Sequence, residues 1–142
     1  LDNLEKTLKN VPIGNPTPSD KIISSYGYRR NPFTGRGAEY HSGIDIKGER
    51  GTPVKTTANG KVEVAGWYGG YGKCVIVKHE NKLKTLYGHL SEITVREGDE
   101  IESGQVIGRL GSTRRSSGPP LHYEIIKDDE KVNPGDYINF HE

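Results

Sequence analysis

The sequence predicts an all-β domain, a small and twisted sheet built from short, mostly antiparallel strands. Nineteen glycines and eight prolines among 142 residues are too many for a helical protein and are typical of strands joined by tight turns. Beyond the first ten residues, the apolar residues show no convincing helical period. The chain is long enough for one domain with a real hydrophobic core.

The composition excludes several classes of function. Twenty Lys and Arg residues against 19 Asp and Glu residues give a net charge of +1, which argues against a nucleic-acid binder because such proteins show a basic stripe. No apolar run has the length of a membrane span, and the start of the chain lacks the basic and apolar regions of a signal peptide. The chain has no methionine, so we expect it to be a piece of a longer protein whose signal or membrane anchor lies outside this sequence.

The chain begins with two features that precede the domain. Leu1, Leu4 and Leu8 share one helical face, whereas the prolines of residues 11–18 end the helix and predict an extended path over the surface. We therefore expect the end of an N-terminal helix plus a Pro-rich linker at residues 1–19, and the domain at residues 20–142. The helix is expected to pack on this domain or on a protein partner.

Turn signals and alternating apolar residues divide the domain into strands. Strands are expected at residues 22–26, 40–46, 52–54, 60–65, 73–78, 83–87, 93–95 and 121–126. Two of them should pair across Asn81 and Lys82. Residues 95–108 predict a short hairpin with turns at Gly98 and Gly104. The single Cys74 lies in an apolar strand and is interpreted as a buried, inert thiol.

The strand at residues 121–126 alternates most clearly. One face carries apolar side chains that suit a core: Leu121, Tyr123 and Ile125. The other face carries Pro120, His122 and Glu124. An imidazole placed there, just after a Pro/Gly-rich loop, is a metal ligand, a catalytic group or a hydrogen-bonded surface residue, and its position alone does not decide among the three.

The chain has five histidines. His79, beside Glu80 at a turn, and His141, in the tail, are interpreted as structural or solvated. The other three are His41, His89 and His122. Each of them borders apolar residues that would anchor a strand end.

His41 is followed four residues later by Asp45. Gly43 and its β-branched neighbours argue against a helix, and four residues of straight strand span about 13 Å, so the two side chains share an ion only if the chain bends at Ser42 and Gly43. Two imidazoles and one carboxylate are a common catalytic zinc set, and zinc makes water a nucleophile near neutral pH. The alternative is three unrelated polar residues near loops, and spacing alone leaves both interpretations open.

An ordered set of short motifs covers most of residues 20–138. The motifs are Tyr26-Gly27-Tyr28-Arg29, His41-Ser42-Gly43-Ile44-Asp45, Gly70-Tyr71-Gly72, Leu86-Tyr87-Gly88-His89-Leu90-Ser91, residues 95–108, residues 111–125 and Val132-Asn133-Pro134. In this order they resemble the lysostaphin/LytM-type zinc metalloendopeptidases, which cut peptide bonds in bacterial peptidoglycan. The resemblance implies a Zn²⁺ site at the floor of a groove over the sheet, walled by loops around residues 67–71 and 114–117.

The resemblance also assigns roles to residues. The H-x-x-x-D motif of the family falls on His41 and Asp45, and its H-x-H motif ends on His122; these three are the implied zinc ligands. The H-L-S motif falls on His89, the implied catalytic histidine. The implied substrates are peptidoglycan stem peptides, which places the protein in the periplasm or outside the cell.

One position departs from the family pattern, because Pro120 stands where the first histidine of H-x-H is expected. In the family that histidine pairs with the H-L-S histidine in handling the proton of the water, and proline offers neither a side-chain donor nor a base. The sequence therefore predicts a zinc endopeptidase with reduced activity. The alternative is a catalytically weakened, metal-binding relative that acts as a cell-wall-binding or partner-regulating scaffold.

A third hypothesis belongs to another class of protein. Residues 95–108 resemble the hairpin of biotin- or lipoyl-carrier domains, which carry a modified lysine at an exposed turn. No lysine lies between Lys84 and Lys127, so the sequence disfavours a carrier.

Overall fold

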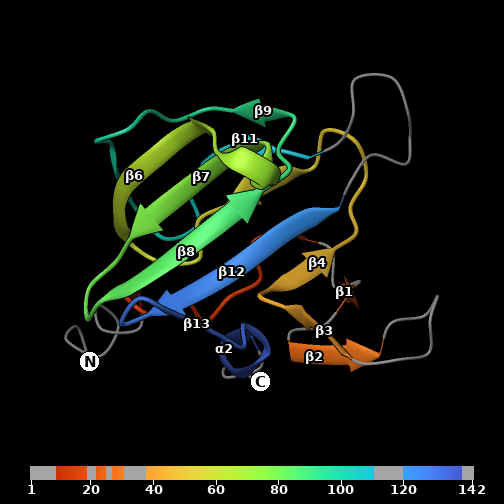
Figure 1. Ribbon diagram of the computed structural model, residues 1–142. Coiled ribbons are helices and arrows are strands. Elements are labelled where there is room, and N and C mark those ends of the chain that lie inside the picture. Colours follow the sequence, from red (N-terminus) through yellow and green to blue (C-terminus); the bar gives the residue numbers. More distant parts are fainter. Residues whose placement is uncertain (1–8, 19–21, 25–26, 31–37, 111–119, 139–142) are drawn as a thin grey trace.

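The computed structural model describes residues 9–18, 22–24, 27–30, 38–110 and 120–138, with the backbone alone for residues 23–24, 27–30 and 38–41 (Figure 1). The strands are β1 (Ile22–Ser24), β2 (Gly27–Arg30), β3 (Ala38–His41), β4 (Ile44–Ile46), β5 (Pro53–Lys55), β6 (Gly60–Trp67), β7 (Lys73–Lys78), β8 (Leu83–Gly88), β9 (Glu92–Ile93), β10 (Glu100–Ile101), β11 (Val106–Arg109), β12 (Leu121–Lys127) and β13 (Glu130–Val132). The predicted all-β class is confirmed.

After residue 10, the described part of the chain holds two short helical segments, although none was expected. They are the 3₁₀ turn η1 (Gly69–Tyr71) and the helix α2 (Gly135–Ile138), of 3 and 4 residues. Such short pieces leave no helical period in a sequence, and α2 is started locally, because the backbone N–H of Gly135 donates to Asn133 Oδ1 at 2.9 Å. None of the helices in the described part of the chain has the length and apolar character that crossing a membrane requires.

The large sheet has eight strands, and every pairing in it is antiparallel. The order is β1-β4-β12-β8-β7-β6-β10, with β13 paired to β12. Two smaller sheets, β5-β11-β9 and β2-β3, accompany it. Figure 1 shows β12 lying between β4 and β8, so the strand that alternates most clearly in the sequence is an interior strand of the main sheet.

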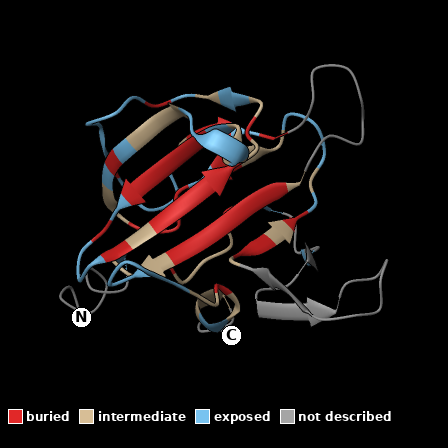
Figure 2. Cartoon of the chain, viewed as in Figure 1, coloured by how far each residue is buried: buried red, intermediate tan, exposed pale blue. Residues whose placement is uncertain are grey.

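The hydrophobic core joins one face of the large sheet to the β5-β11-β9 sheet. Figure 2 shows that buried residues are concentrated on β7, β8 and β12. The predicted apolar face is confirmed, since Leu121, Tyr123 and Ile125 are all fully buried in this core. Cys74 lies in a smaller cluster with Ile76, and burial raises the pKa of its thiol to about 12, as expected of an inert cysteine.

Local turn signals predicted the β7–β8 hairpin correctly. Lys78 pairs with Lys84, and Asn81 and Lys82 both have φ of 60°, as a tight hairpin turn requires.

The predicted hairpin over residues 95–108 is wrong. Gly98 and Gly104 do make turns, with φ of 94° and 89°, but β10 pairs with β6 while β11 pairs with β5 and β9. Ile101 and Ile107 are both buried in the core. Pairing with strands of two different sheets buries them, which a local hairpin would not do.

The segment before β1 is attached to the domain, whereas an extended path over the surface was expected. The carbonyl of Pro16 accepts from the backbone N–H of Lys55 at 2.8 Å, and Pro12, Pro16 and Thr17 are buried. Proline has no N–H to leave unpaired against the core. Residues 1–8 of the helix expected over residues 1–10, and the domain boundary expected near residue 20, lie outside the described residues.

A chain of polar groups crosses the core. Buried His79 contacts the carbonyl of Asn59 through Nδ1 at 2.7 Å and Thr85 Oγ1 through Nε2 at 2.8 Å. Thr85 Oγ1 is hydrogen-bonded to Tyr87 Oη at 2.8 Å. The ring of His79 is therefore satisfied on both sides, in agreement with its structural interpretation. Burial lowers the pKa of His79, and the hydrogen bond with Asn59 opposes this only in part.

The lowered pKa of His79 predicts a loss of stability in mild acid. As the pH falls below about 6.5, the histidine of the unfolded chain takes up a proton before that of the folded chain. The free energy of unfolding should therefore decrease with falling pH, and this contribution should level off below the folded-state pKa. His79→Gln should flatten the decrease, measured by urea unfolding between about pH 8 and about pH 5.

Thr85→Val is the matched control, because it removes a partner of His79 but keeps the titrating ring. It should lower the stability while leaving a pH dependence. Equal slopes in His79→Gln and the wild type would contradict the assignment.

The chain bends at Gly43, between β3 and β4, where the sequence permits a bend. A Cβ on Gly43 would collide with the carbonyl oxygen of Tyr123 and stand 2.7 Å from Glu124 Cγ. Only glycine therefore lets this part of the chain approach β12.

Gly43→Ala should force β4 away from β12 and lower the free energy of unfolding by about 1–3 kcal/mol, measured by urea unfolding. Gly70→Ala is the control, because a Cβ there meets nothing within 4 Å. Equal, small effects of the two substitutions would show that the bend tolerates a side chain.

Candidate active site

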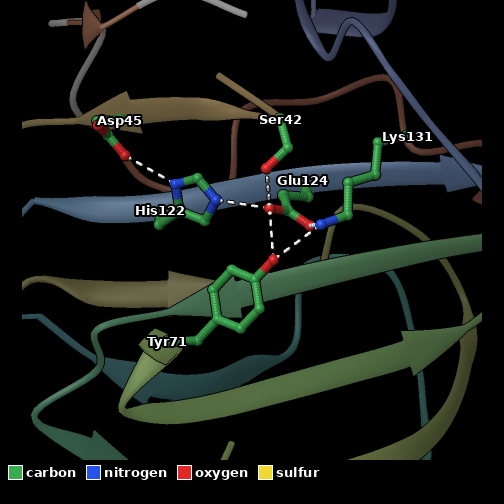
Figure 3. Close-up of polar contacts among 6 residues, drawn as sticks. All are labelled: Ser42, Asp45, Tyr71, His122, Glu124 and Lys131. Atoms are coloured by element: carbon green, nitrogen blue, oxygen red, sulfur yellow. Dashed lines mark hydrogen bonds and ion pairs between the residues drawn. The ribbon is translucent and has the colours of Figure 1, made fainter. Parts of the chain in front are cut away.

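Asp45 and His122 meet on neighbouring strands. They are register partners in the β4–β12 pair, so their side chains share one face of the sheet. His122 Nδ1 lies 2.8 Å from Asp45 Oδ1 (Figure 3). His41 ends β3, one bend before β4, but its side chain lies outside the described residues. The structure therefore brings together two of the three predicted ligands.

Glu124 is a site residue that the sequence did not single out. It is fully buried, and its Oε2 accepts hydrogen bonds from His122 Nε2 at 2.7 Å, Ser42 Oγ at 2.6 Å and Tyr71 Oη at 3.0 Å. Its Oε1 faces Lys131 Nζ at 3.4 Å. Figure 3 shows these groups gathered around one carboxylate. The strand alternation places Glu124 on the face of His122, but its burial depends on other segments.

The ring of His122 is held between two carboxylates. Burial lowers the pKa of His122, but the hydrogen bonds and charges of Asp45 and Glu124 outweigh it and raise the pKa to about 9. Carboxylates only accept hydrogen bonds, so both ring nitrogens are satisfied by protons only in the imidazolium form. A cation between Nδ1 and Asp45 would replace one of these protons, and nitrogen and carboxylate donors suit zinc.

The described residues contain no group of three or more His, Cys, Asp or Glu side chains placed to hold a metal ion. Asp45 and His122 supply two donors, and the third predicted donor is His41. Without the side chain of His41, the proposed set is not complete within the described part of the chain.

His89 stands beside this pair. It follows β8 with a left-handed φ of 60°, which is uncommon outside glycine, and its backbone N–H donates to the carbonyl of Tyr71 at 2.7 Å. Its ring lies edge-on to that of His122, with centroids 6.2 Å apart. Burial, together with the charge of His122, lowers the pKa of His89, while Asp45 opposes this.

An aromatic loop adjoins the candidate site. Tyr71 stacks on the ring of His122 with centroids 5.5 Å apart, and Tyr68 stacks on Tyr71 at 6.0 Å. Trp67 is 77% exposed. The loop around residues 67–71 thus lies where one groove wall was expected. The second expected wall, residues 114–117, lies outside the described residues, and the groove itself stays a prediction.

Pro120 lies immediately before β12 and is partly buried. Its ring therefore lies next to the start of β12, two residues before His122. Its side chain brings no hydrogen-bonding group to this end of the strand.

Comparison with known proteins identifies relatives along most of the chain. The model of the family "Peptidase family M23" matches residues 39–134. The DD-carboxypeptidase/endopeptidase Mpg of Neisseria meningitidis serogroup B is 43% identical over 119 residues, which are 84% of this chain and 27% of the relative. The peptidoglycan DD-endopeptidase ShyA of Vibrio cholerae is 37% identical over 133 residues, 93% of this chain and 30% of the relative.

A solved structure supports the same assignment. The crystal structure of a zinc-containing peptidase from Vibrio cholerae superposes with a TM-score of 0.72 at 34% identity, covering 86% of this chain and 39% of that one. The chain spans less than a third of the length of the two curated relatives above. The motif-based resemblance is thus confirmed, and the chain belongs to peptidase family M23.

Proposed function

We propose that this domain is a zinc-dependent endopeptidase that hydrolyses peptide cross-links of bacterial peptidoglycan. The observation that carries the proposal is the Asp45–His122 pair, 2.8 Å apart on neighbouring strands, with His89 beside it in an M23 domain. The relative ShyA is named a peptidoglycan DD-endopeptidase. Peptidoglycan lies in the cell envelope, so the domain would act in the periplasm or outside the cell.

His41, Asp45 and His122 would hold the zinc. Two imidazole nitrogens and a carboxylate leave a position open, as in catalytic zinc sites. When bound, zinc would supply Lewis-acid activation of the scissile carbonyl and of a water molecule. Asp45 and His122 already face each other, and only the bend at Ser42 and Gly43 separates His41, at the end of β3, from β4.

His89 would move the proton of the attacking water. Its ring is next to that of His122, and a neutral imidazole accepts a proton and later returns it to the leaving amine. Its backbone is fixed by the hydrogen bond to Tyr71, so the ring is presented from a defined position.

Pro120 limits the proposed activity. A single positioned acid–base group contributes on the order of 10²- to 10⁴-fold to a rate, and proline provides none. The same residue favours the alternative function, a metal-binding scaffold that binds the cell wall or regulates a protein partner through the expected N-terminal helix. The two functions differ in whether cross-links are cut.

The zinc content of the purified protein tests the proposed ligands. We expect about one zinc per chain, measured by elemental analysis after dialysis, and its loss in Asp45→Ala and in His41→Ala. Asp136→Ala, on the exposed surface of α2, is the matched control and should keep its zinc. Full zinc in either ligand variant would refute the ligand set.

The endopeptidase activity is tested separately. Zinc-loaded protein that leaves both directly linked and pentaglycine-bridged muropeptides intact over long incubations would refute the endopeptidase.

The role of Pro120 is tested by restoring the imidazole. Pro120→His should raise the rate of muropeptide cleavage by on the order of 10²-fold or more at unchanged zinc content. Pro120→Asn is the control, because it removes the proline without adding an imidazole. It should give no such gain. If Pro120→His binds zinc but leaves hydrolysis unchanged, the scaffold function is favoured.

A further inference from the structure

The carboxylate of Glu124 occupies a place that metal binding alone does not explain. It contacts Nε2 of His122, on the side of the ring away from Asp45. It is fully buried, and burying a carboxylate is costly unless it is paired and hydrogen-bonded. The chain nevertheless directs several polar groups from separate segments at it.

The hydrogen bonds at Oε2 have only one consistent direction. A carboxylate accepts and does not donate, so the hydroxyls of Ser42 and Tyr71 and the Nε2–H of His122 all donate to Glu124. A neutral ring with its proton on Nε2 carries a lone pair on Nδ1, the nitrogen that faces Asp45. The opposite tautomer would place the Nε2 lone pair against a carboxylate oxygen 2.7 Å away.

The carboxylate of Glu124, on β12, is contacted from three other parts of the fold. Ser42 comes from the bend before β4, Tyr71 from η1 and Lys131 from β13. Lys131 Nζ donates to Tyr71 Oη at 2.9 Å and lies 3.4 Å from Glu124 Oε1. This ammonium lies beside the buried negative charge and offsets part of the cost of burying it.

We propose that Glu124 is the positioning residue of His122: it fixes the imidazole in the tautomer whose Nδ1 ligates the metal, and Ser42, Tyr71 and Lys131 fix Glu124. The proposal rests on the zinc site proposed above but not on peptidoglycan cleavage. Partners that orient a ligating histidine in this way are generally worth about 10- to 100-fold in metal affinity.

The test measures zinc itself rather than activity. Glu124→Gln keeps the shape of the side chain but loses its charge, and it should bind zinc about 10- to 100-fold more weakly than the wild type in competition with a chromophoric chelator. Tyr71→Phe keeps the ring beside His122 but removes one donor, so it should give a smaller loss in the same direction. Glu92→Gln, on exposed β9, is the matched control and should bind as the wild type does.

Side-chain ¹⁵N spectra of the zinc-loaded protein provide a second readout. In the wild type, His122 should show a protonated Nε2 and an Nδ1 signal shifted by zinc. In Glu124→Gln, the Nε2 proton should exchange faster with solvent. A purely structural role would lower the urea midpoint but leave zinc affinity and the ring signals unchanged, and this result would overturn the proposal. If Glu124→Gln does not fold, Tyr71→Phe binding as the wild type does would overturn it equally.

The outcomes separate this inference from the proposed function. Wild-type protein that binds zinc through Nδ1 of His122 but cuts no muropeptide supports the positioning role and refutes the endopeptidase. If the wild-type protein cuts muropeptides and Glu124→Gln binds zinc with full affinity, only the positioning role is refuted. A wild-type chain that binds no zinc overturns both.

Discussion

The pairing of β4 with β12 is the constraint on which the site depends. It places Asp45 directly opposite His122, and a slip of one residue would turn one of the two side chains to the other face of the sheet. On its other edge β12 pairs with β8, where His122 stands opposite Gly88, the residue before His89. The register of β12 with its two neighbouring strands therefore sets the positions of Asp45, His122 and His89. The buried apolar face of β12 keeps the strand in this register.

The two faces of β12 are both buried, for different reasons. The core face is apolar and gains stability from burial. The other face carries His122 and Glu124, whose burial is offset by the hydrogen bonds of His122 to Asp45 and Glu124 and by the ion pair of Glu124 with Lys131. A buried ionic group is weak evidence for stability. A buried carboxylate next to a histidine breaks the rule that a protein core is apolar. Such exceptions are expected at functional sites.

Regular patterns in the sequence predicted the features that are set by residues close together in the chain. Alternation identified the core face of β12, and Ser42 and Gly43 permitted the bend that separates β3 from β4. Predictions that depend on distant partners were less successful. Gly98 and Gly104 mark real turns, but the choice of pairing strand is decided by burial elsewhere. Glu124 is recognisable only in three dimensions, because its partners come from segments up to 82 residues away.

The residues proposed to hold the metal and those proposed to move a proton come from different parts of the strands. Asp45 and His122 lie within paired strands, and Glu124 accepts a hydrogen bond from His122. His89 and Pro120 lie just beyond a strand end, at positions where the ladder imposes no side-chain requirement. Proline is tolerated at the start of a strand because its missing N–H is not needed there. In the proposed function, proline at that place withholds a proton-transfer group while the contacts inside β12 stay intact, so zinc binding and turnover would be physically separable.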